Sequence, residues 1–303
     1  MKKDLANLDL RRAKIIKKCS PYAYQIPTII LMAVLMVVPM VMVVRYSLMD
    51  NVITNKNPQF VGFANYAKVL TDSVFLETVG NTLYFTVVSV VFHMIIGLGF
   101  AMMLNSSLLH KVPKAIFRAI YVMPWMFTAT IVAILWRLLL DPSGVINYVL
   151  KALNIIGSYV EWFGSTKTAL HAITFVNLWA GYPLYMVSLL AGLQGISGDL
   201  YEAGMIDGAN GRQKFCYITI PQLMPVIRSI AMLDFIWTMQ VFPLVWMTTG
   251  GGPIHATEML STYTYKLAFS SYKFSLASAS AVVILVFSLI IAAFYLRYQK
   301  ARD

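Results

Sequence analysis

The sequence predicts an all-α integral membrane protein with six transmembrane helices. Of its 303 residues, 59% are hydrophobic and only 12% are charged, and the mean hydropathy is +0.69. Soluble domains carry about a quarter charged residues, so this composition indicates a surface that mostly faces lipid. Six separate stretches are also apolar over the roughly 20 residues that a helix needs to cross the hydrocarbon core.

The six apolar stretches are predicted to be helices, because lipid offers the backbone no hydrogen-bond partner and each segment must satisfy its own N–H and C=O groups. They cover residues 22–45, 80–104, 115–140, 168–193, 222–248 and 277–297. Four contain a proline, and each proline predicts a kink. These prolines are Pro39, Pro124, Pro183 and Pro243.

The first stretch follows a basic tail, as the apolar core of a secretory signal would. Such a core is only about 7–15 residues long and precedes a cleavage site with small residues. Here the apolar run is longer and continues through Val43-Val44-Arg45-Tyr46. We therefore expect an uncleaved first span.

Lysine and arginine residues set the predicted orientation. Seven lie in the N-terminal tail, three in the loop after the second stretch, two in the loop after the fourth, and three at the C-terminus. The side richer in Lys and Arg is cytoplasmic by the positive-inside rule. This divides the chain into a cytoplasmic basic N-terminal tail (1–21), a six-helix transmembrane domain (22–297) and a cytoplasmic C-terminus (298–303).

Composition also bears on cofactors and nucleic acids. The two cysteines, Cys19 and Cys216, have no metal-ligand spacing around them and give no disulfide framework. The net charge of +11 is typical of nucleic-acid binders, but the basic residues cluster beside apolar segments, and no basic-aromatic groove is apparent. Basic membrane flanks explain the charge, and no metal or nucleic-acid site is predicted.

A polar, glycine-broken loop at 199–221 separates the fourth and fifth stretches. Its pattern is Glu202-Ala203-Gly204, three residues, Gly208, nine residues, Ile218, one residue, and Ile220-Pro221. Residues 199–206 predict a short amphipathic helix, because apolar residues recur there at helical spacing. The glycines permit a close backbone approach, and Pro221 is expected to mark the start of the fifth span.

This pattern resembles the cytoplasmic EAA loop of permease subunits of bacterial ATP-binding-cassette (ABC) importers. Gly204 stands where that family usually has alanine, and Ile220 stands where it usually has leucine. The resemblance implies a type I importer fold in which the loop forms a coupling helix that docks on a separate ATPase. The residues that it assigns to coupling are Glu202, Ala203, Gly204, Asp207, Gly208, Ile218 and Pro221.

Residues outside the loop narrow the resemblance, which covers about residues 22–297. In order they are Asn81-Thr82-Leu83, Pro124-Trp125, Trp136-Arg137, Gly144, Asn147, Trp162, Trp179, Pro183, Ala191-Gly192-Leu193-Gln194, Thr249-Gly250-Gly251-Gly252-Pro253 and Thr257-Glu258. Together they resemble carbohydrate-uptake ABC permeases of the maltose type and the sn-glycerol-3-phosphate type, within the binding-protein-dependent transport family.

That family implies a machine in the bacterial inner membrane that imports a sugar or oligosaccharide. A second permease, two ATPase subunits and an extracytoplasmic binding protein would accompany this chain. The sequence contains no Gly-x4-Gly-Lys-[Ser/Thr] phosphate-binding loop. We therefore expect that the chain is not an enzyme and binds no cofactor, and that the partner ATPases use ATP and Mg²⁺.

A mid-span carboxylate is the first candidate for the solute pathway, because an ionisable group there usually faces a cavity or the bundle interior. Asp234 lies 13 residues beyond Pro221, roughly 20 Å along a helix. Helical spacing places Trp237, Thr238 and Val241 on its face, with Gln240 beside the tryptophan. The alternative is that Asp234 pairs with a polar group on a neighbouring helix or on the second subunit.

The fourth stretch offers two further pathway candidates. Asn177 and Gly181 share a face, and the glycine could leave room for ligand. The alternative is polar contact and close helix packing. For His93, which lies midway between Ser89 and Gly97, a hydrogen bond between packed helices is favoured over a proton relay.

Three other functions stay open. An ABC permease for a polyol or a glycerol phosphodiester would share every feature above. An ion-coupled secondary carrier would need its own coupling site near the midplane, for which Asp234 alone is thin support. A membrane enzyme is disfavoured because no His-Glu-x-x-His, Gly-x-Ser-x-Gly or paired intramembrane carboxylates occur.

Overall fold

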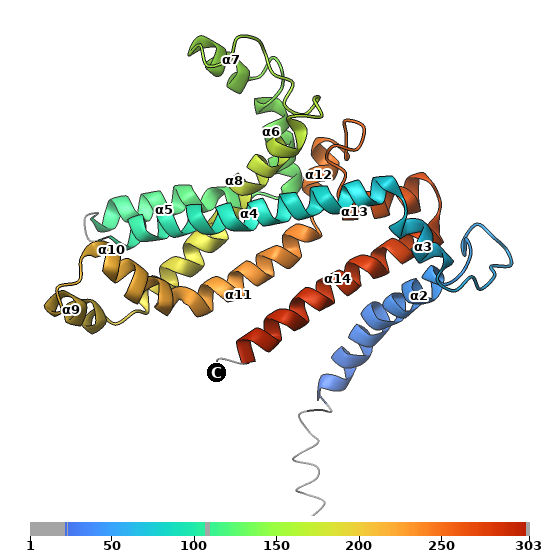
Figure 1. The fold of residues 1–303 in the computed structure, drawn as a ribbon, viewed down its shortest axis with the longest axis horizontal. Coiled ribbons are helices and arrows are strands. Elements are labelled where there is room, and N and C mark those ends of the chain that lie inside the picture. The colour runs from blue at the N-terminus through green and yellow to red at the C-terminus, as the bar shows by residue number, and fades with distance from the viewer. Residues whose placement is uncertain (1–21, 23, 107–109, 301–303) are drawn as a thin grey trace, which may run out of the picture.

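The computed structural model describes residues 22, 24–106 and 110–300, and this part of the chain is built from helices (Figure 1). The predicted basic tail, residues 1–21, and the last three residues lie outside the described residues. Within them β-pairing amounts to an isolated antiparallel bridge between Met49 and Phe60. The all-helical prediction is confirmed.

Five helices are long and apolar enough to cross a membrane. They are Tyr24–Ser47, which contains the π-turn η1 (Ala33–Val37) and α2 (Val38–Ser47), then α4 (Ser73–Asn105), α8 (Ala169–Gln194), Gly211–Met239, and the apolar part of α14, Phe274–Ala293. The bent pair α5 (Lys111–Met126) and α6 (Ala129–Leu139) passes the same test of length and composition when taken together, which gives six spans if the pair counts as one. The helix α14 itself continues to Lys300.

The third predicted span, 115–140, is wrong as a single helix. Its two halves, α5 and α6, meet at an angle of 98°. The backbone of Phe127 and Thr128 is extended, and the Thr128 hydroxyl accepts a hydrogen bond from the N–H of Ile131, which starts α6 as a new helix. Pro124, which lies in the last turn of α5, also lacks the N–H that would continue the hydrogen-bond ladder.

The fifth predicted span, 222–248, is also wrong at its C-terminal end. Its helix stops at Met239, and Pro243–Thr248 form the separate helix α12. Pro243 is in the first turn of α12, where its missing N–H costs nothing, rather than inside a continuous span as expected.

Three apolar clusters make up the core, and α4 contributes to each. One joins α4 to α6, α8 and α12 around Phe85, Ile173 and Val245. The second joins α4 to α8 and α11 (Ile220–Met239) around Tyr185 and Leu189. The third joins α4 to the short helices α3 (Ala64–Leu70) and α13 (Leu260–Tyr265) and to α14. Figure 1 shows α4 running along the length of this assembly.

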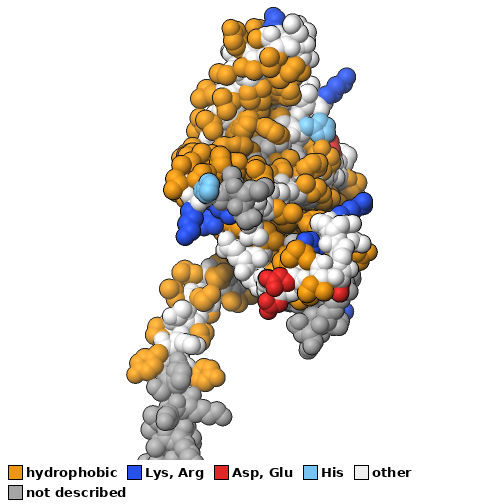
Figure 2. Space-filling model, turned by 90° about the vertical axis from the view of Figure 1, so that its left-hand side faces the viewer, with side chains coloured by type: hydrophobic (Ala, Val, Ile, Leu, Met, Phe, Trp, Pro, Cys, Tyr) orange, Lys and Arg blue, Asp and Glu red, His pale blue; other side chains and the backbone are white. Residues whose placement is uncertain are grey.

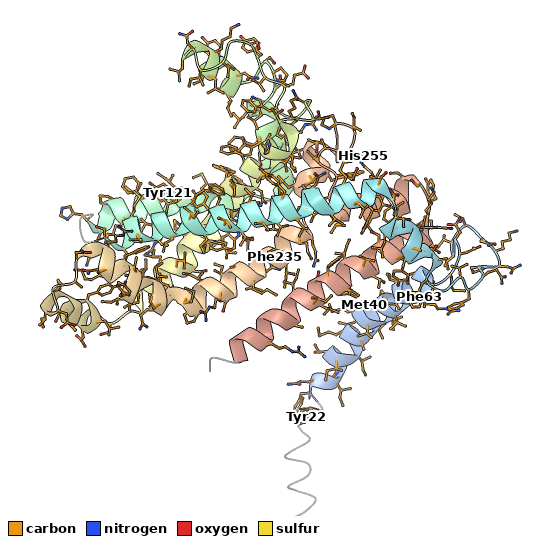
Figure 3. The ribbon with its side chains drawn as sticks, in the orientation of Figure 1. Tyr22, Met40, Phe63, Tyr121, Phe235 and His255 are labelled. Carbon is orange, nitrogen blue, oxygen red and sulfur yellow. The ribbon has the colours of Figure 1, made fainter. Side chains whose placement is uncertain are left out.

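Many large hydrophobic side chains lie on the surface. Hydrophobic side chains dominate the face seen in Figure 2. The helix Tyr24–Ser47 is the extreme case, because none of its apolar window is buried, although α2 packs beside α14. Most of its apolar side chains are exposed, and Met40 is 50% exposed (Figure 3). Such a surface is suited to lipid or to other apolar chains.

Short helices and loops complete the end opposite α9 (Gly198–Ile206). They include α7 (Val145–Ala152) and the π-turn η3 (Lys266–Ser270). The Asn147 side chain, which is fully buried, organises the loop around α7 by hydrogen bonds to Asp141, Pro142, Val160 and Trp162. A second loop connects α12 to α13. The Asn81 side chain of α4 donates to two backbone oxygens of this loop, those of His255 and Glu258, at 3.1 and 3.3 Å.

Candidate functional site

The predicted short helix exists as α9, one residue longer at its start than expected. The Ser197 side chain caps it by accepting from the N–H of Asp199 at 3.3 Å. At its end the N–H of Ala209 donates to the Gly204 oxygen, and the N–H of Gly208 donates to the Met205 oxygen. This pair of bonds is a Schellman motif, which places Gly208 in the left-handed region with φ of 76°.

Two contacts fasten α9 to the base of the fifth span. A Cβ at Gly204 would lie 3.0 Å from the Ile218 side chain, so the backbone of α9 runs close over that isoleucine. The Tyr201 and Thr219 hydroxyls are 3.0 Å apart and hydrogen bonded. Two residues of the sequence pattern, Gly204 and Ile218, thus touch each other. These contacts hold α9 against the base of the fifth span.

The sequence predicted that Pro221 marks the start of the fifth span, but the helix begins ten residues earlier, at Gly211. A capping box between Asn210 and Gln213 opens a helix at Gly211, and this helix runs unbroken to Met239. It contains α10 (Gly211–Lys214) and the π-turn η2 (Phe215–Thr219), where the N–H of Ile220 donates to the Phe215 oxygen. A π-turn widens the ladder by one residue, which accommodates a proline inside the helix.

The remaining pattern residues of α9 face outward. The side chains of Glu202, Ala203 and Asp207 are exposed, and Ile206 is 87% exposed. The predicted apolar stripe of α9, made by Leu200, Ala203 and Ile206, is exposed among the described residues, with Leu200 42% exposed. Figure 2 views the molecule from this end and shows acidic side chains beside hydrophobic ones. An exposed apolar stripe flanked by carboxylates is suited to docking on another protein.

Asp234 is buried, with 7% of its surface exposed. Its Oδ2 lies 2.9 Å from Nδ1 of His93 and accepts from the Tyr185 hydroxyl at 3.1 Å. Its Oδ1 accepts from the Thr238 hydroxyl at 3.0 Å. The sequence left two interpretations of this carboxylate, a contact with the solute and a pairing with polar groups on a neighbouring helix. The structure contains the pairing.

The sequence placed Trp237, Thr238 and Val241 on the same face of the fifth span as Asp234. In the structure only Thr238 shares the buried face of Asp234. Trp237 is 61% exposed while Asp234 and Thr238 are buried, because three residues turn a helix by about 300° rather than a full circle. Val241 lies beyond the end of the helix at Met239, so the i+7 spacing no longer applies. Gln240 is exposed at the helix end and donates to the Ser288 hydroxyl at 3.4 Å.

Asn177 and Gly181 do share a face of α8, but α4 occupies the space in front of them. The Asn177 side chain donates to the Ser89 hydroxyl at 2.9 Å. Any Cβ at Gly181 would overlap the imidazole of His93. The room at Gly181 is therefore filled by His93 rather than left for a ligand.

A cavity that the sequence did not indicate lies between α8 and α11. Its volume is about 420 Å³, and its lining includes Leu184, Ser188, Leu233 and Trp237. Leu184 and Ser188 are four residues apart, so they form one stripe on α8. That spacing was available in the sequence, but apolar residues and serine at helical spacing are too common to single out.

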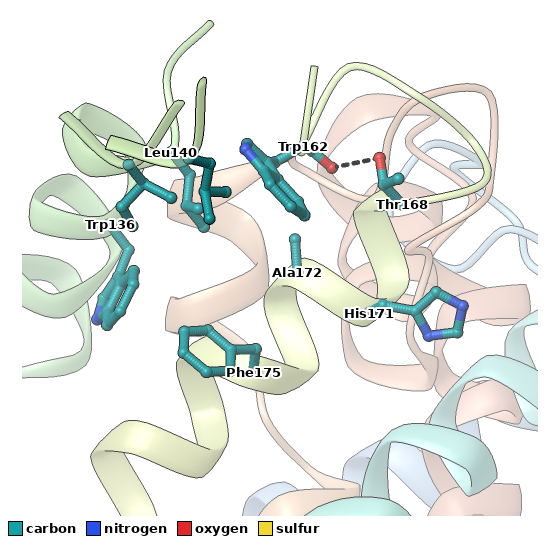
Figure 4. Close-up of a pocket in the computed structure, with 9 residues that line it drawn as sticks. Trp136, Leu140, Trp162, Thr168, His171, Ala172 and Phe175 are labelled. Atoms are coloured by element: carbon teal, nitrogen blue, oxygen red, sulfur yellow. Dashed lines mark hydrogen bonds between the residues drawn. The ribbon is translucent and has the colours of Figure 1, made fainter. Parts of the chain in front are cut away.

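A second cavity, of about 500 Å³, lies between α6, α7 and the N-terminal end of α8 and is almost wholly apolar (Figure 4). Trp136, Trp162 and Phe175 supply most of its walls, and Thr168 donates to the Trp162 oxygen at its rim. Among the described residues, no three His, Cys, Asp or Glu side chains lie close enough to hold a metal ion.

Burial and local hydrogen bonds shift the pKa of two ionisable groups outside the long helices, Asp141 and Tyr263. The Ser143 hydroxyl and N–H both donate to the Asp141 carboxylate, at 2.6 and 2.9 Å, and this lowers the pKa of Asp141. Burial raises the pKa of Tyr263, and its hydrogen bond to Asp72 raises it further. Both groups keep their usual charge at neutral pH.

Comparison with known proteins gives these features a context. The family described as "Binding-protein-dependent transport system inner membrane component" matches residues 93–302. The trehalose/maltose transport system permease protein MalF of Thermococcus litoralis is 35% identical over 297 residues, which cover 97% of this chain and 96% of that protein. A probable ABC transporter permease protein, y4oQ, of Sinorhizobium fredii is 33% identical over 94% of this chain and 91% of its own length.

The fold has a close counterpart among solved structures. A chain of a bacterial ABC transporter involved in the import of the acidic polysaccharide alginate superposes with a TM-score of 0.82 at 23% identity, covering 96% of this chain and 99% of its own. At that identity the likeness concerns the fold, which is that of a type I ABC importer permease. The chain belongs to the family of inner membrane components of binding-protein-dependent transport systems.

Proposed function

We propose that this chain is the transmembrane permease subunit of an ATP-driven importer for a sugar or oligosaccharide delivered by an extracytoplasmic binding protein. The exposed helix α9 carries the proposal, because it presents an exposed apolar stripe at the junction of two spans. Relatives named for trehalose and maltose transport, and for a multiple sugar-binding transport system in Streptococcus mutans at 28% identity, support a sugar as the solute.

The importer we propose contains a second, homologous permease and two ATPase subunits. The ATPases hydrolyse ATP with Mg²⁺, and this chain supplies no group to that chemistry. The chain lies in the inner membrane with both termini, and α9 between α8 and Gly211–Met239, on the cytoplasmic side. The distribution of Lys and Arg supports this orientation.

Coupling in this proposal uses the residues of the predicted loop in two ways. Glu202, Ala203 and Asp207 lie on the exposed surface that meets the ATPase. Gly204, Gly208, Ile218 and Pro221 act from behind it by holding α9 on the fifth span. ATP-driven closure of the ATPase pair displaces α9 and shifts the permease between inward-open and outward-open arrangements.

The solute pathway in this proposal follows the α8–α11 cavity. Trp237 offers a solute the face of an exposed aromatic ring, and Ser188 offers a hydroxyl. The other predicted pathway residues support this wall from behind or from its ends: Asn177, Gly181, Asp234, Thr238, Gln240 and Val241. An aromatic face against the apolar side of a sugar ring, with a hydroxyl nearby, suits a carbohydrate.

Reconstitution of the full importer into liposomes tests the proposal. The chain would be purified with its membrane partners, and uptake of labelled maltose and trehalose would be measured with binding protein outside and ATP inside. Uptake that needs ATP and binding protein, and survives ionophores, is the expected result. Uptake that needs an ion gradient instead would establish an ion-coupled carrier.

The same vesicles separate the other solute classes. Sorbitol and glycerophosphocholine serve as the polyol and the glycerol phosphodiester. ATP-driven uptake of either one, with none of the two sugars, would keep the ABC importer and overturn the assignment of a sugar. Competition with unlabelled compounds then ranks the solutes by affinity.

A further inference from the structure

A polar cluster joins three spans inside the apolar core. His93 of α4 and Asp234 of α11 are 1% and 7% exposed, and their Nδ1 and Oδ2 atoms are 2.9 Å apart. Asn177 and Tyr185 of α8 bind the same pair. Ionisable groups inside a membrane-spanning bundle are costly, so a pair that is kept there calls for a role.

Hydrogen-bond chemistry fixes the net charge of the pair. Nε2 of His93 lies 3.0 Å from the backbone oxygen of Asn177, and because a carbonyl only accepts, Nε2 carries a proton. The contact between Nδ1 and Oδ2 then contains one proton, on the imidazole or on the carboxyl. In both cases the pair is electrically neutral, which lowers the cost of burying it.

Both oxygens of the Asp234 carboxyl group are already engaged. Oδ2 has His93 and Tyr185 as partners, and Oδ1 accepts from Thr238. These contacts use three of the about four acceptor sites of a carboxylate, and burial leaves little of the group accessible to a solute. The group is therefore built into contacts between helices.

Small residues bring α4 and α8 close enough for the cluster to form. Ser89, His93 and Gly97 are spaced four apart and lie on the face of α4 that meets α8. At Gly97 an added Cβ would lie 2.9 Å from the backbone nitrogen of Met186, and at Gly181 it would overlap His93. The contact between the helices thus extends over at least two turns.

We infer that the His93–Asp234 pair is a positioning element that makes α4, α8 and α11 move as one body during transport. The inference rests on the proposed function. The coupling helix α9 is joined by the chain to α8 and to the helix that contains α11, whereas α4 lies elsewhere in the chain. The outer end of α4 holds the loop at 255–260 through Asn81 and Thr82. The pair thereby transmits displacement of α9 to that loop.

Four variants in the reconstituted importer test this role: Asp234→Leu, His93→Leu, the double Leu variant and Asp234→Asn. The measurements are the KM for the solute and the number of ATP molecules hydrolysed per solute imported. Each single Leu change should raise ATP per solute about threefold or more, while KM stays within about twofold. The double variant should be no worse than the worse single one, because both remove the same contact.

The conservative variant and a remote control sharpen the result. Asp234→Asn offers an amide N–H that can donate to the unprotonated Nδ1 of a neutral His93, so ATP per solute should stay within about twofold of the wild-type value. Thr264→Val removes a hydrogen bond of 2.7 Å between α13 and α14 and should leave the ratio unchanged. A raised KM with an unchanged ratio, or single effects that multiply in the double variant, would overturn the inference.

A second test applies if the Leu variants do not assemble. In a chain with Cys19 and Cys216 replaced by Ser, His93→Cys and Asp234→Cys would be joined by a short thiol cross-linker. Transport that survives cross-linking is expected if α4 and α11 move as one body. Transport lost on cross-linking and regained on reduction would overturn it. A wild-type complex without ATP-driven uptake would instead contradict the proposed function.

Discussion

At the scale of single residues, environment decides what a side chain does. Asp234 and Trp237 are three positions apart on one helix, yet the first is enclosed by α4 and α8 and the second is 61% exposed beside a cavity. The sequence identified both as unusual within an apolar span. It did not reveal that His93 fills the space at Gly181, because this depends on the packing of α4 against α8.

Replacing Trp237 by alanine should weaken solute binding. Loss of the aromatic face is expected to raise the KM for uptake by about tenfold, which corresponds to about 1.4 kcal/mol of stacking. Trp237→Phe retains a ring and should stay within about threefold. Trp125→Ala is the matched control, because Trp125 is 53% exposed on α5 and does not line the cavity. An unchanged KM in Trp237→Ala would remove this residue from the pathway.

Replacing Gly208 by alanine should loosen the end of α9. A φ of 76° is strained for any residue with a Cβ, at a cost of about 1 kcal/mol. Hydrogen exchange of the backbone amides of residues 203–209 should become faster, and the coupling of ATP hydrolysis to uptake should fall. Gly211→Ala is the control, because a Cβ there meets open space at an ordinary φ. Equal exchange in the two variants would contradict the role of Gly208.

At the scale of elements, the existence of the spans could be predicted and their ends could not. Hydropathy over about 20 residues finds a segment that lipid forces into a helix, because the cost of unsatisfied backbone groups is large. The bend at Thr128 and the start at Gly211 depend on local capping hydrogen bonds, one at Ile131 and a reciprocal pair between Asn210 and Gln213. Such local bonds are averaged away in a hydropathy window.

Asn147→Ala tests how far one side chain organises an element. The change leaves the oxygens of Asp141, Pro142 and Val160 and the indole N–H of Trp162 without this partner. The expected loss of stability is about 1–3 kcal/mol, measured as a lower melting temperature in detergent. Ser158→Ala, at an exposed position of the same loop, should leave the melting temperature unchanged. Equal melting of both variants would show that packing alone holds the loop.

At the scale of the whole molecule, the fold and the family could be predicted because an ordered set of weak signals extended over most of the chain. The pattern around Glu202 placed a short helix between two spans, and the structure contains it as α9. The division of α9 into an outer face and a supporting face could not be predicted, because it arises from contacts of Gly204 and Tyr201 with the next helix.

Glu202→Lys should separate transport from assembly of the chain in the membrane. Reversing an exposed charge at the docking surface is expected to lower ATP-driven uptake by about tenfold or more, because like charges across an interface cost several kcal/mol. The chain should still insert and fold. Uptake and recovery of the ATPase subunits on purification measure the effect, with Glu161→Lys in the outer loop as control. Full uptake by Glu202→Lys would contradict the coupling role of α9.

The largely exposed helix Tyr24–Ser47 makes the chain sensitive to bilayer thickness at one place. Its 24 residues are about 36 Å long, whereas the hydrocarbon layer is about 30 Å thick. A helix longer than the layer tilts to match it, and packing against neighbouring helices limits that tilt. Among the described residues this helix packs beside α14, and hydrogen bonds with Asn65 and Tyr66 of α3 hold its Ser47 end. We therefore expect its other end to tilt as the membrane thins or thickens, while the three clusters around α4 keep their shape.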